Sequence, residues 1–380
     1  MNRSQLRALI TESLSSQGFR LRGAEILPPR NLTKERLRKL HSMAVKHRIE
    51  KSKGGLSRHE DRLLEYIAAG SEVKPEMILP QMVEVTPDSE EELLFRHASL
   101  HWSIPVSSGY GRRLRFVVFD EQNGKLIGLI GLGDPIFSLG ARDQWVGWDM
   151  HGRKQRLFNV LDAFVLGAVP PYSALLGGKL IAMLASSNEV RSAFERKYGA
   201  RKSLIGERKL DRRLALITTT SALGRSSVYN RIRYEGRTLF KSVGFTEGSG
   251  DFHFANGLYD SICQYTVRYC QPTAKQERWG TGFRNRREVV RKCLAKIGLS
   301  PNWAYHGVRR EVFVVPLAKN TQQFLAGQHS RLQWFDQPAS DLFAAFRERW
   351  LLPRASRDQR YRDFIPSSYR LWGKATNNGG

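Results

Sequence analysis

The chain has 380 residues, which is more than one hydrophobic core usually organises, so two or three domains are expected. Its 61 lysines and arginines exceed its 36 acidic residues, and the formal charge of +25 predicts a polyanionic partner. Three cysteines without a CxxC pair, and histidines without ligand-like spacing, argue against a disulfide framework and a structural zinc site. No apolar run is long enough to span a bilayer and the N-terminus does not read as a secretory signal. We therefore expect a cytoplasmic protein without membrane contact.

Residues 1–100 are expected to form a helical N-terminal region. Helical spacing of apolar residues follows Thr33, Ser57 and Ser89, each of which is placed to cap a helix N-terminus. Glu60 and Glu92 stand three residues after the last two, at capping-box spacing. Between the second and third helices, the proline-punctuated stretch VKPEMILPQMVEVTP is predicted to be extended.

Residues 101–260 carry a mixed pattern. A β-hairpin is predicted from RLRFVVFD and KLIGLIGLG, because an Asn-Gly turn signal separates the two runs. Further strands are predicted in DQWVGWDM, LALITTTSA and VGFTEGSGDFHF, and helices in YSALLGGKLIAMLASSNEVRSAFERKYG and SSVYNRIRY. This order favours an α/β (α+β) fold with a central mixed sheet and flanking helices.

Residues 261–380 form the third predicted region, which is basic and mixed in character. Its clearest helix is RNRREVVRKCLAKIG, with Asn285 as the N-cap and Glu288 three residues later. A strand is predicted in EVFVVPLA and a further helix in DLFAAFRERWLL.

The central region resembles the GNAT acetyltransferase superfamily. The hairpin is similar to the central strands of that fold. The stretch DAFVLGAVPPYSALLGGKLIAML is similar to its fourth strand and to the helix that receives the cofactor pyrophosphate. The stretch TLFKSVGF is similar to its closing segment, where a helix ends before the last strand. The resemblance implies cofactor-binding positions at Ser173, Gly177 and Gly178 and a tyrosine general acid at the position of Phe240. Here Leu176 crowds the cradle and phenylalanine has no proton to give. We therefore expect a GNAT-like frame without ordinary acetyl transfer, with a divergent transferase as an alternative.

A second resemblance runs from about Leu100 to Tyr259. The stretches SIPVSSGYGRRLRFVV, RDQWVGWD, ITTTSALGRSSVYNRI and VGFTEGSGDFHF are similar to the DruA family of the Druantia anti-phage systems. The resemblance implies a bacterial defence component that acts with partner proteins, one of them a large helicase. It carries no catalytic assignment.

Two stretches are candidates for nucleic-acid contact. GYGRRLRF combines arginines that fork onto phosphate with a tyrosine that stacks on a base, although a solvated basic strand edge explains it equally well. GRSSVYNRIR is favoured, because its first residues are expected to open a helix with free N–H groups; the alternative is a serine that caps its own helix. The predicted contacts are Tyr110, Arg112, Arg113 and Arg115; Lys197, Arg201 and Lys202; Arg225, Ser226, Ser227, Tyr229, Asn230, Arg231 and Arg233; and Arg286, Arg287 and Lys292.

One stretch is a weak candidate for catalysis. Asp251 and His253 in GSGDFHF are expected to point the same way from a strand, where they would bind a metal or move a proton; a structural hydrogen bond is the commoner role. With Asp134, Asp143, Asp149 and Glu235 they leave a Mg²⁺-dependent nuclease or strand-transfer enzyme as an alternative. The leading expectation is a DNA-binding protein, with the form of the DNA, single- or double-stranded, and self-association left open.

Overall fold

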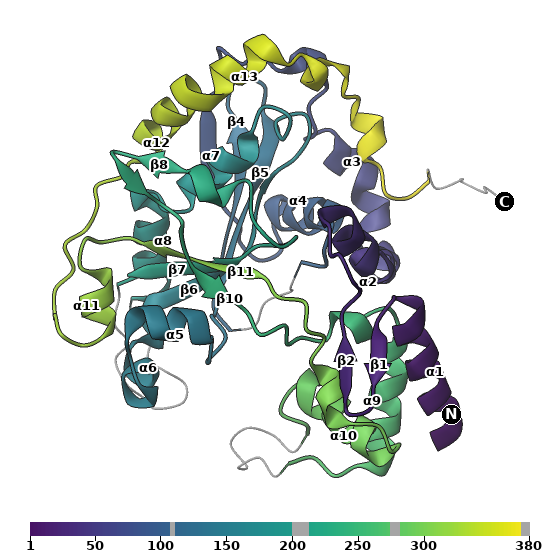
Figure 1. Ribbon diagram of the computed structural model, residues 1–380. Coiled ribbons are helices and arrows are strands. Elements are labelled where there is room, and N and C mark those ends of the chain that lie inside the picture. The colour runs from purple at the N-terminus through teal and green to yellow at the C-terminus, as the bar shows by residue number, and fades with distance from the viewer. Residues whose placement is uncertain (107–110, 200–212, 274–281, 374–380) are drawn as a thin grey trace.

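The computed structural model describes residues 1–106, 111–199, 213–273 and 282–373. Tyr110, Arg201 and Lys202 lie outside the described residues. A seven-stranded mixed sheet with helices on both faces forms the larger part, and a smaller helical lobe lies beside it (Figure 1). The predicted mixed α/β class is confirmed.

The sheet has the strand order β10-β11-β7-β6-β5-β4-β3. Only β6 and β7 run parallel among these neighbours, and the other pairs are antiparallel. The predicted hairpin is confirmed as β4 and β5, with Gly124 at φ 70° in its turn. The strands are β3 (Pro80–Glu84), β4 (Arg113–Asp120), β5 (Lys125–Gly133), β6 (Val160–Ala168), β7 (Leu216–Thr220), β10 (Lys241–Phe245) and β11 (Glu311–Pro316).

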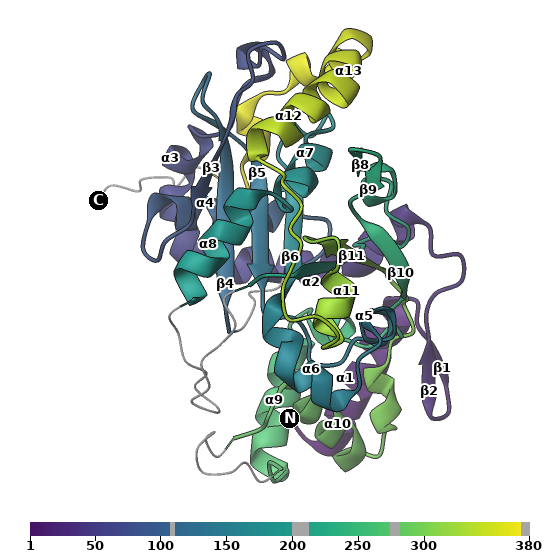
Figure 2. The same cartoon turned by 90° about the vertical axis from the view of Figure 1, so that its left-hand side faces the viewer.

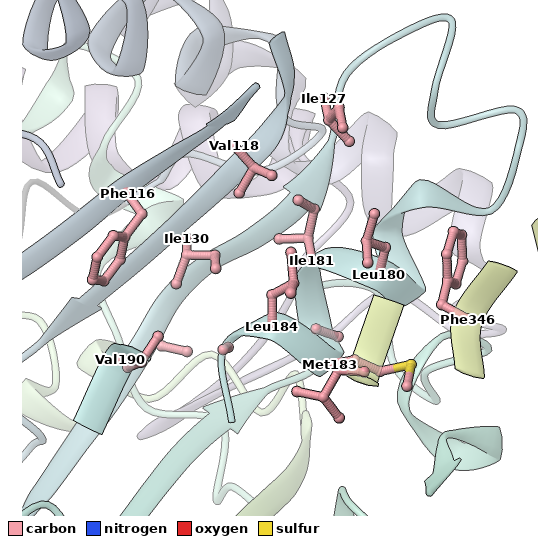
Figure 3. Close-up of a cluster of buried hydrophobic side chains, with 14 of the residues drawn as sticks. Phe116, Val118, Ile127, Ile130, Leu180, Ile181, Met183, Leu184, Val190 and Phe346 are labelled. Atoms are coloured by element: carbon pink, nitrogen blue, oxygen red, sulfur yellow. The ribbon is translucent and has the colours of Figure 1, made fainter. Parts of the chain in front are cut away.

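Alternation along the strands sends apolar side chains to both faces of the sheet. Phe116 and Val118 of β4 pack with Ile181 of α7 and Phe346 of α12 on one face (Figure 3). Val117, between them in the sequence, packs on the other face with the helices α3 and α4. Figure 2 shows the strands of the sheet side by side, with α8 (Asn188–Tyr198) in front of them.

The helices begin largely where the sequence predicts. Thr33, Ser89 and Asn285 each accept a backbone N–H of the first turn, as expected for N-caps. The helices are α1 (Arg3–Ser16), α2 (Lys34–Leu56), α3 (Glu60–Leu64), α4 (Glu90–Ala98), α5 (Gly140–Val146), α6 (Met150–Arg156), α7 (Gly177–Leu184), α8 (Asn188–Tyr198), α9 (Leu258–Tyr269), α10 (Arg286–Lys296), α11 (Thr321–Leu325), α12 (Ala339–Phe346) and α13 (Leu352–Arg357).

The small lobe joins the N-terminal residues to the segment from Phe252 to Val308 around a second hydrophobic cluster. Leu6, Ile10 and Leu14 of α1 pack against α9 and α10, and the short strands β1 (Arg20–Arg22) and β2 (Glu25–Leu27) complete it. Two antiparallel segments, residues 246–251 and 305–310, connect the lobe to the sheet; we call them the connector. The division of the chain at residues 100 and 260 stays a prediction.

Two predicted elements are wrong. DQWVGWDM belongs to α5 and α6, because Gly147 at φ 78° ends the first helix and Asp149 caps the second. SSVYNRIRY forms a 3-10 turn and then β8 (Arg233–Tyr234), which pairs with β9 (Arg237–Thr238) through a two-residue turn with positive φ. No α-helix therefore lies in residues 221–240, between β7 and β10, although the GNAT resemblance implies one.

The predicted capping box at Ser57 is also absent, because Glu60 is turned inward. Its buried carboxylate accepts from His97 at 3.1 Å and from the backbone N–H groups of Leu371 and Trp372 at 2.7 and 3.2 Å. A carboxylate with this many donors ties the end of the described chain to the N-terminal helices.

Candidate nucleic-acid interface

Two arginines of the GYGRRLRF stretch are held inside the protein. Arg112 donates from Nε to Asp134 Oδ1 at 2.6 Å and from Nη1 to the Phe158 carbonyl at 2.6 Å. Arg115 donates to Glu92 Oε1 at 2.7 Å. The two arginine side chains are only 12% and 13% exposed. Because internal acceptors take their donors, the geometry argues against the predicted phosphate contacts at Arg112 and Arg115.

The basic residues beside them differ in their surroundings. Arg113 is exposed at the start of β4. Lys197 of α8 donates from Nζ to Glu84 Oε1 at 2.8 Å, and Arg196 donates to the other oxygen of the same carboxylate at 2.7 Å. Glu84 therefore neutralises part of the positive charge at Lys197. Arg113 stays a candidate for phosphate contact because its side chain is exposed.

The GRSSVYNRIR stretch forms a tight turn in place of the expected helix N-terminus. Ser226 Oγ accepts from two backbone N–H groups of the turn at 3.2 and 3.0 Å, and the Ser226 N–H donates to Glu311 at 3.2 Å. Asn230 donates from its side chain to the Ser226 carbonyl at 2.8 Å. These bonds occupy the groups expected to face a phosphate, so Ser226 is a self-capping residue.

Tyr229 in the same stretch is a core residue. Its ring stacks on Phe240 with centroids 4.7 Å apart and planes 7° from parallel, and it meets the edge of Phe313 at 5.3 Å. Burial raises the pKa of the Tyr229 hydroxyl to about 12. Phe240 covers one face of the ring and Tyr229 is partly buried, so the geometry argues against the predicted stacking role.

The structure brings Arg231 beside two residues that the sequence did not mark, Lys179 and Arg349. Lys179 of α7 is buried and donates from Nζ to the Val228 carbonyl at 3.0 Å. Lys179 Nζ thus contacts the turn three residues before Arg231, and it lies 5.5 Å from the centroid of the Trp350 ring. The Arg349 guanidinium lies 4.9 Å from the same centroid. Burial lowers the pKa of Lys179, and the charges of Arg231 and Arg349 lower it further. Within the described residues none of the three forms an ion pair with a carboxylate. We call Lys179, Arg231 and Arg349 the cation patch.

One signal in the sequence pointed to this cluster. Lys179 interrupts the apolar run GGKLIAML, and a lysine in a helix that packs on a sheet is unusual. Nothing in the sequence indicated Arg349, because it comes from the C-terminal helices. The exposed residues Arg225, Ser227 and Arg233 lie on the same turn and hairpin as Arg231.

The loop before α7 packs on itself. The N–H of Gly177 donates to the Tyr172 carbonyl at 3.0 Å, and the N–H of Ser173 donates to the Val169 carbonyl at 2.9 Å. A Cβ on Gly177 would lie 2.7 Å from the Tyr172 oxygen, whereas one on Gly178 would meet nothing within 4 Å. The residues of the predicted cradle, Gly178 apart, therefore do not fit an acyl-cofactor pyrophosphate.

On the small lobe, two predicted arginines lie against aromatic rings. The guanidinium of Arg286 is 3.6 Å from the Tyr259 ring centroid, and that of Arg287 is 5.7 Å from the Tyr305 ring centroid. Lys292 lies 3.4 Å from a carboxylate one helical turn earlier. Arg286 and Arg287 are exposed, so both stay candidates for contact with an anion.

Asp251 and His253 do not share a strand face. They lie at a 3-10 turn over Phe252–Phe254, where Asp251 forms an ion pair with Arg286. His253 is fully buried, with Nε2 2.9 Å from the Trp303 carbonyl oxygen, and burial lowers its pKa to about 4. The strand predicted in VGFTEGSGDFHF is confirmed at its start, which lies in β10, and is wrong at Asp251 and His253. The structural hydrogen bond is the role that the geometry gives to His253.

The other carboxylates weighed for a metal site are separately engaged. Asp134 binds Arg112, Asp143 binds Arg142 and Arg153 at 2.7 and 2.8 Å, and Asp149 caps α6. In the described part of the chain no group of three or more histidine, cysteine, aspartate or glutamate side chains is placed to hold a metal ion. The geometry therefore gives the nuclease alternative no support.

The fold and these sites define a mixed α/β protein with clustered cations. The chain belongs to the DruA family: the family model for Druantia protein DruA matches residues 31–327. A curated Druantia protein DruA from Escherichia coli is 40% identical over 363 residues, which are 95% of this chain and 90% of that protein. The chain is therefore a component of a Druantia anti-phage defence system.

Two further findings bear on the predictions. No solved structure matches the chain, so the GNAT-like character of the central region stays a prediction. Within the described ranges no helix is both long and apolar enough to cross a membrane.

Proposed function

We propose that this DruA protein binds DNA through the cation patch, as one component of a defence complex that includes other proteins and a helicase. The observation that carries the proposal is the proximity of Lys179, Arg231 and Arg349 without a carboxylate among the described residues. Like charges held together repel one another, and a phosphate backbone relieves that repulsion while releasing its own counterions.

The chemistry of the patch favours backbone recognition over base reading. Arg225, Ser227 and Arg233 are exposed beside it and extend the set of donors for phosphate oxygens. Tyr229, the one aromatic residue of the stretch, stacks on Phe240 and contacts Phe313, so it packs on the core of the protein. Affinity should therefore depend strongly on salt and weakly on sequence.

The proposal places this binding surface on a GNAT-like frame that does not transfer acetyl groups. The order hairpin β4–β5, strand β6, helix α7 and strand β7 supports the frame. The self-packed loop at Gly177 and the buried Phe240 argue against the transferase chemistry.

The test is fluorescence anisotropy of labelled single-stranded and duplex DNA over a salt series, with wild type and Arg231→Gln/Arg349→Gln. We expect salt-sensitive binding by wild type and weaker binding by the double variant. Arg62→Gln is the matched control, because Arg62 is also exposed but is paired with Glu90 at 2.8 Å. Equal binding by all three proteins would show that the patch is not the interface. DNA that shortens in the presence of Mg²⁺ would restore the nuclease alternative.

A further inference from the structure

A cleft of about 730 Å³ lies between α2, the connector and one end of the sheet. It is distinct from the cation patch, since none of Lys179, Arg231 and Arg349 lines it. Its volume is within the range of small-molecule and cofactor sites, about 300–1,000 Å³. Four side chains of its wall decide what it would bind: His41, Arg48, Lys51 and Arg310.

Arg310 is a half-buried cation without a counter-charge. Its Nη2 lies 3.3 Å from His41 Nε2, and this is the only side-chain contact of the guanidinium among the described residues. Hydrogen bonds between the connector segments hold its backbone: the Arg310 N–H donates to Thr246 Oγ1 at 3.0 Å, and the Thr246 N–H donates to the Arg310 carbonyl at 2.8 Å. Burial lowers the pKa of Arg310, because nearby protein replaces the water that would solvate its charge.

His41 adds a buried donor to the same wall. It is 0% exposed, and burial and the charge of Arg310 lower its pKa to about 3, so its ring is neutral near pH 7. Since Arg310 donates to Nε2, the single ring proton is on Nδ1. Nδ1 has no partner among the described residues. A buried N–H without an acceptor is costly, and an anionic oxygen would satisfy it.

The same face of α2 carries two further cations. Arg48 is seven residues after His41, two helical turns further on, and Lys51 follows three residues later. Within the part of the chain that the structure describes, the Arg48 side chain forms no hydrogen bond or ion pair, and burial lowers its pKa. Arg48 and Arg310 thus bring two uncompensated guanidinium groups to one cleft.

The acidic residues of the cleft leave this pair uncompensated. Asp251 is paired with Arg286. Asp162 accepts from Thr218 Oγ1 at 2.6 Å, and burial raises its pKa to about 6. Asp260 lines the cleft and is exposed. Phe252 and Tyr259 supply aromatic surface to the same wall.

We propose that the cleft binds a phosphate ester of nucleotide size, with the phosphate between Arg310, Arg48 and the Nδ1–H of His41. Guanidinium groups bind phosphate through paired hydrogen bonds, and the aromatic residues of the wall supply apolar surface for the rest of the ligand. The ligand is either a free nucleotide or the phosphorylated end of a nucleic-acid strand, since both present the same chemistry.

The direct test is calorimetric titration of the full-length protein with dAMP and, separately, with inorganic phosphate. We expect wild type to bind dAMP, and Arg310→Met to weaken binding by about 10- to 100-fold, as for the loss of hydrogen bonds to a charged group. Arg310→Lys should weaken it less, because it keeps the charge. Arg62→Gln is the matched control and should bind dAMP as wild type does, because Arg62 is paired with Glu90 and does not line the cleft.

A second measurement distinguishes the two sources of the phosphate. Oligonucleotides with a 5′-phosphate and with a 5′-hydroxyl are compared in competition with dAMP. If dAMP binds and the two oligonucleotides compete equally, the ligand is a free nucleotide. If the oligonucleotide with a 5′-phosphate competes better and Arg310→Met abolishes this preference, the ligand is the end of a strand. No binding of dAMP, phosphate or the phosphorylated end, or binding unchanged in Arg310→Met, would overturn the proposal. These outcomes are separate from failure of the cation patch, which Arg231→Gln/Arg349→Gln measures.

Discussion

Arg112, beside the start of strand β4, and the arginines of the cleft have opposite surroundings. Arg112 meets Asp134 and two backbone carbonyls, so that its charge and its donors are satisfied inside the protein. Arg310 and Arg48 are also partly buried, yet they have no carboxylate partner in the described chain. The comparison teaches that partners, more than burial or residue type, separate a structural arginine from one available to a ligand. Such a distinction makes different predictions for stability and for binding.

The largest expected effect is on the paired side. Arg112→Ala removes one member of a largely buried ion pair, so Asp134 Oδ1 and the Phe158 and Val160 carbonyls lose the donors of the guanidinium, while the backbone N–H of residue 112 still reaches Asp134 Oδ2. The loss in the free energy of unfolding should be about 3–5 kcal/mol. Urea denaturation followed by circular dichroism measures it. Arg225→Ala, at an exposed site, should change stability by less than about 0.5 kcal/mol. A loss below about 1 kcal/mol for Arg112→Ala would contradict the structural role.

Acid should destabilise the folded protein around the cleft, where the arginines are unpaired. The pKa values of His41, His253 and His306 are lowered to about 3, 4 and 2, first of all by burial. Between those values and about 6.5 the unfolded state binds more protons than the folded state. The stability that these neutral histidines contribute is therefore fully present above about pH 6.5 and is lost as the pH falls below that value.

The size of this effect tests the neutral state of His41. Each fully buried histidine contributes up to about 1.4 kcal/mol per pH unit below 6.5. Urea midpoints between pH 7.5 and 5 give the slope, and His41→Gln should reduce it because one titrating group is gone. The same slope in His41→Gln would show that His41 is not a buried neutral residue beside Arg310.

Features that depend on residues close together in the sequence could be predicted, and features that depend on residues far apart could not. Helix caps such as Thr33 and the β4–β5 turn at Gly124 depend on residues a few positions apart, and both were predicted. The role of Arg112 depends on Asp134, 22 residues later, and on Phe158, 46 residues later. Its basic, glycine-flanked stretch was therefore interpreted as surface.

The cleft could not be predicted for the same reason. His41 and Arg310 meet across 269 residues, and they are brought together by a lobe built from both parts of the chain. The cation patch was predicted in part, at Arg231, because a basic stretch marks its own surface. Lys179 and Arg349 join it only through the packing of α7 against the C-terminal helices.

The cation patch gives the next effect, which is on binding. Each cation that neutralises a phosphate contributes about 0.9 to the salt slope on duplex DNA, so Arg231→Gln/Arg349→Gln should reduce that slope by about 2. Anisotropy between 50 and 200 mM salt, about the range over which such binding changes most, measures it. The folded state should be no less stable than wild type, because like charges have been removed. A lower urea midpoint together with weaker binding would instead indicate a packing role.

The smallest expected effect is the sharpest test of the comparison. Arg310→Met exchanges a half-buried, unpaired cation for an apolar side chain of similar length. The lost contact to His41 and the removed cost of burying the charge act in opposite directions, so unligated stability should stay within about 1 kcal/mol of wild type. Arg112→Met, the matched change at the paired site, should lose several times more, because it leaves a carboxylate uncompensated. Urea denaturation of both variants measures the two losses in stability. A loss in Arg310→Met as large as that in Arg112→Met would mean that Arg310 stabilises the fold. The main argument that the cleft binds a ligand would then fail.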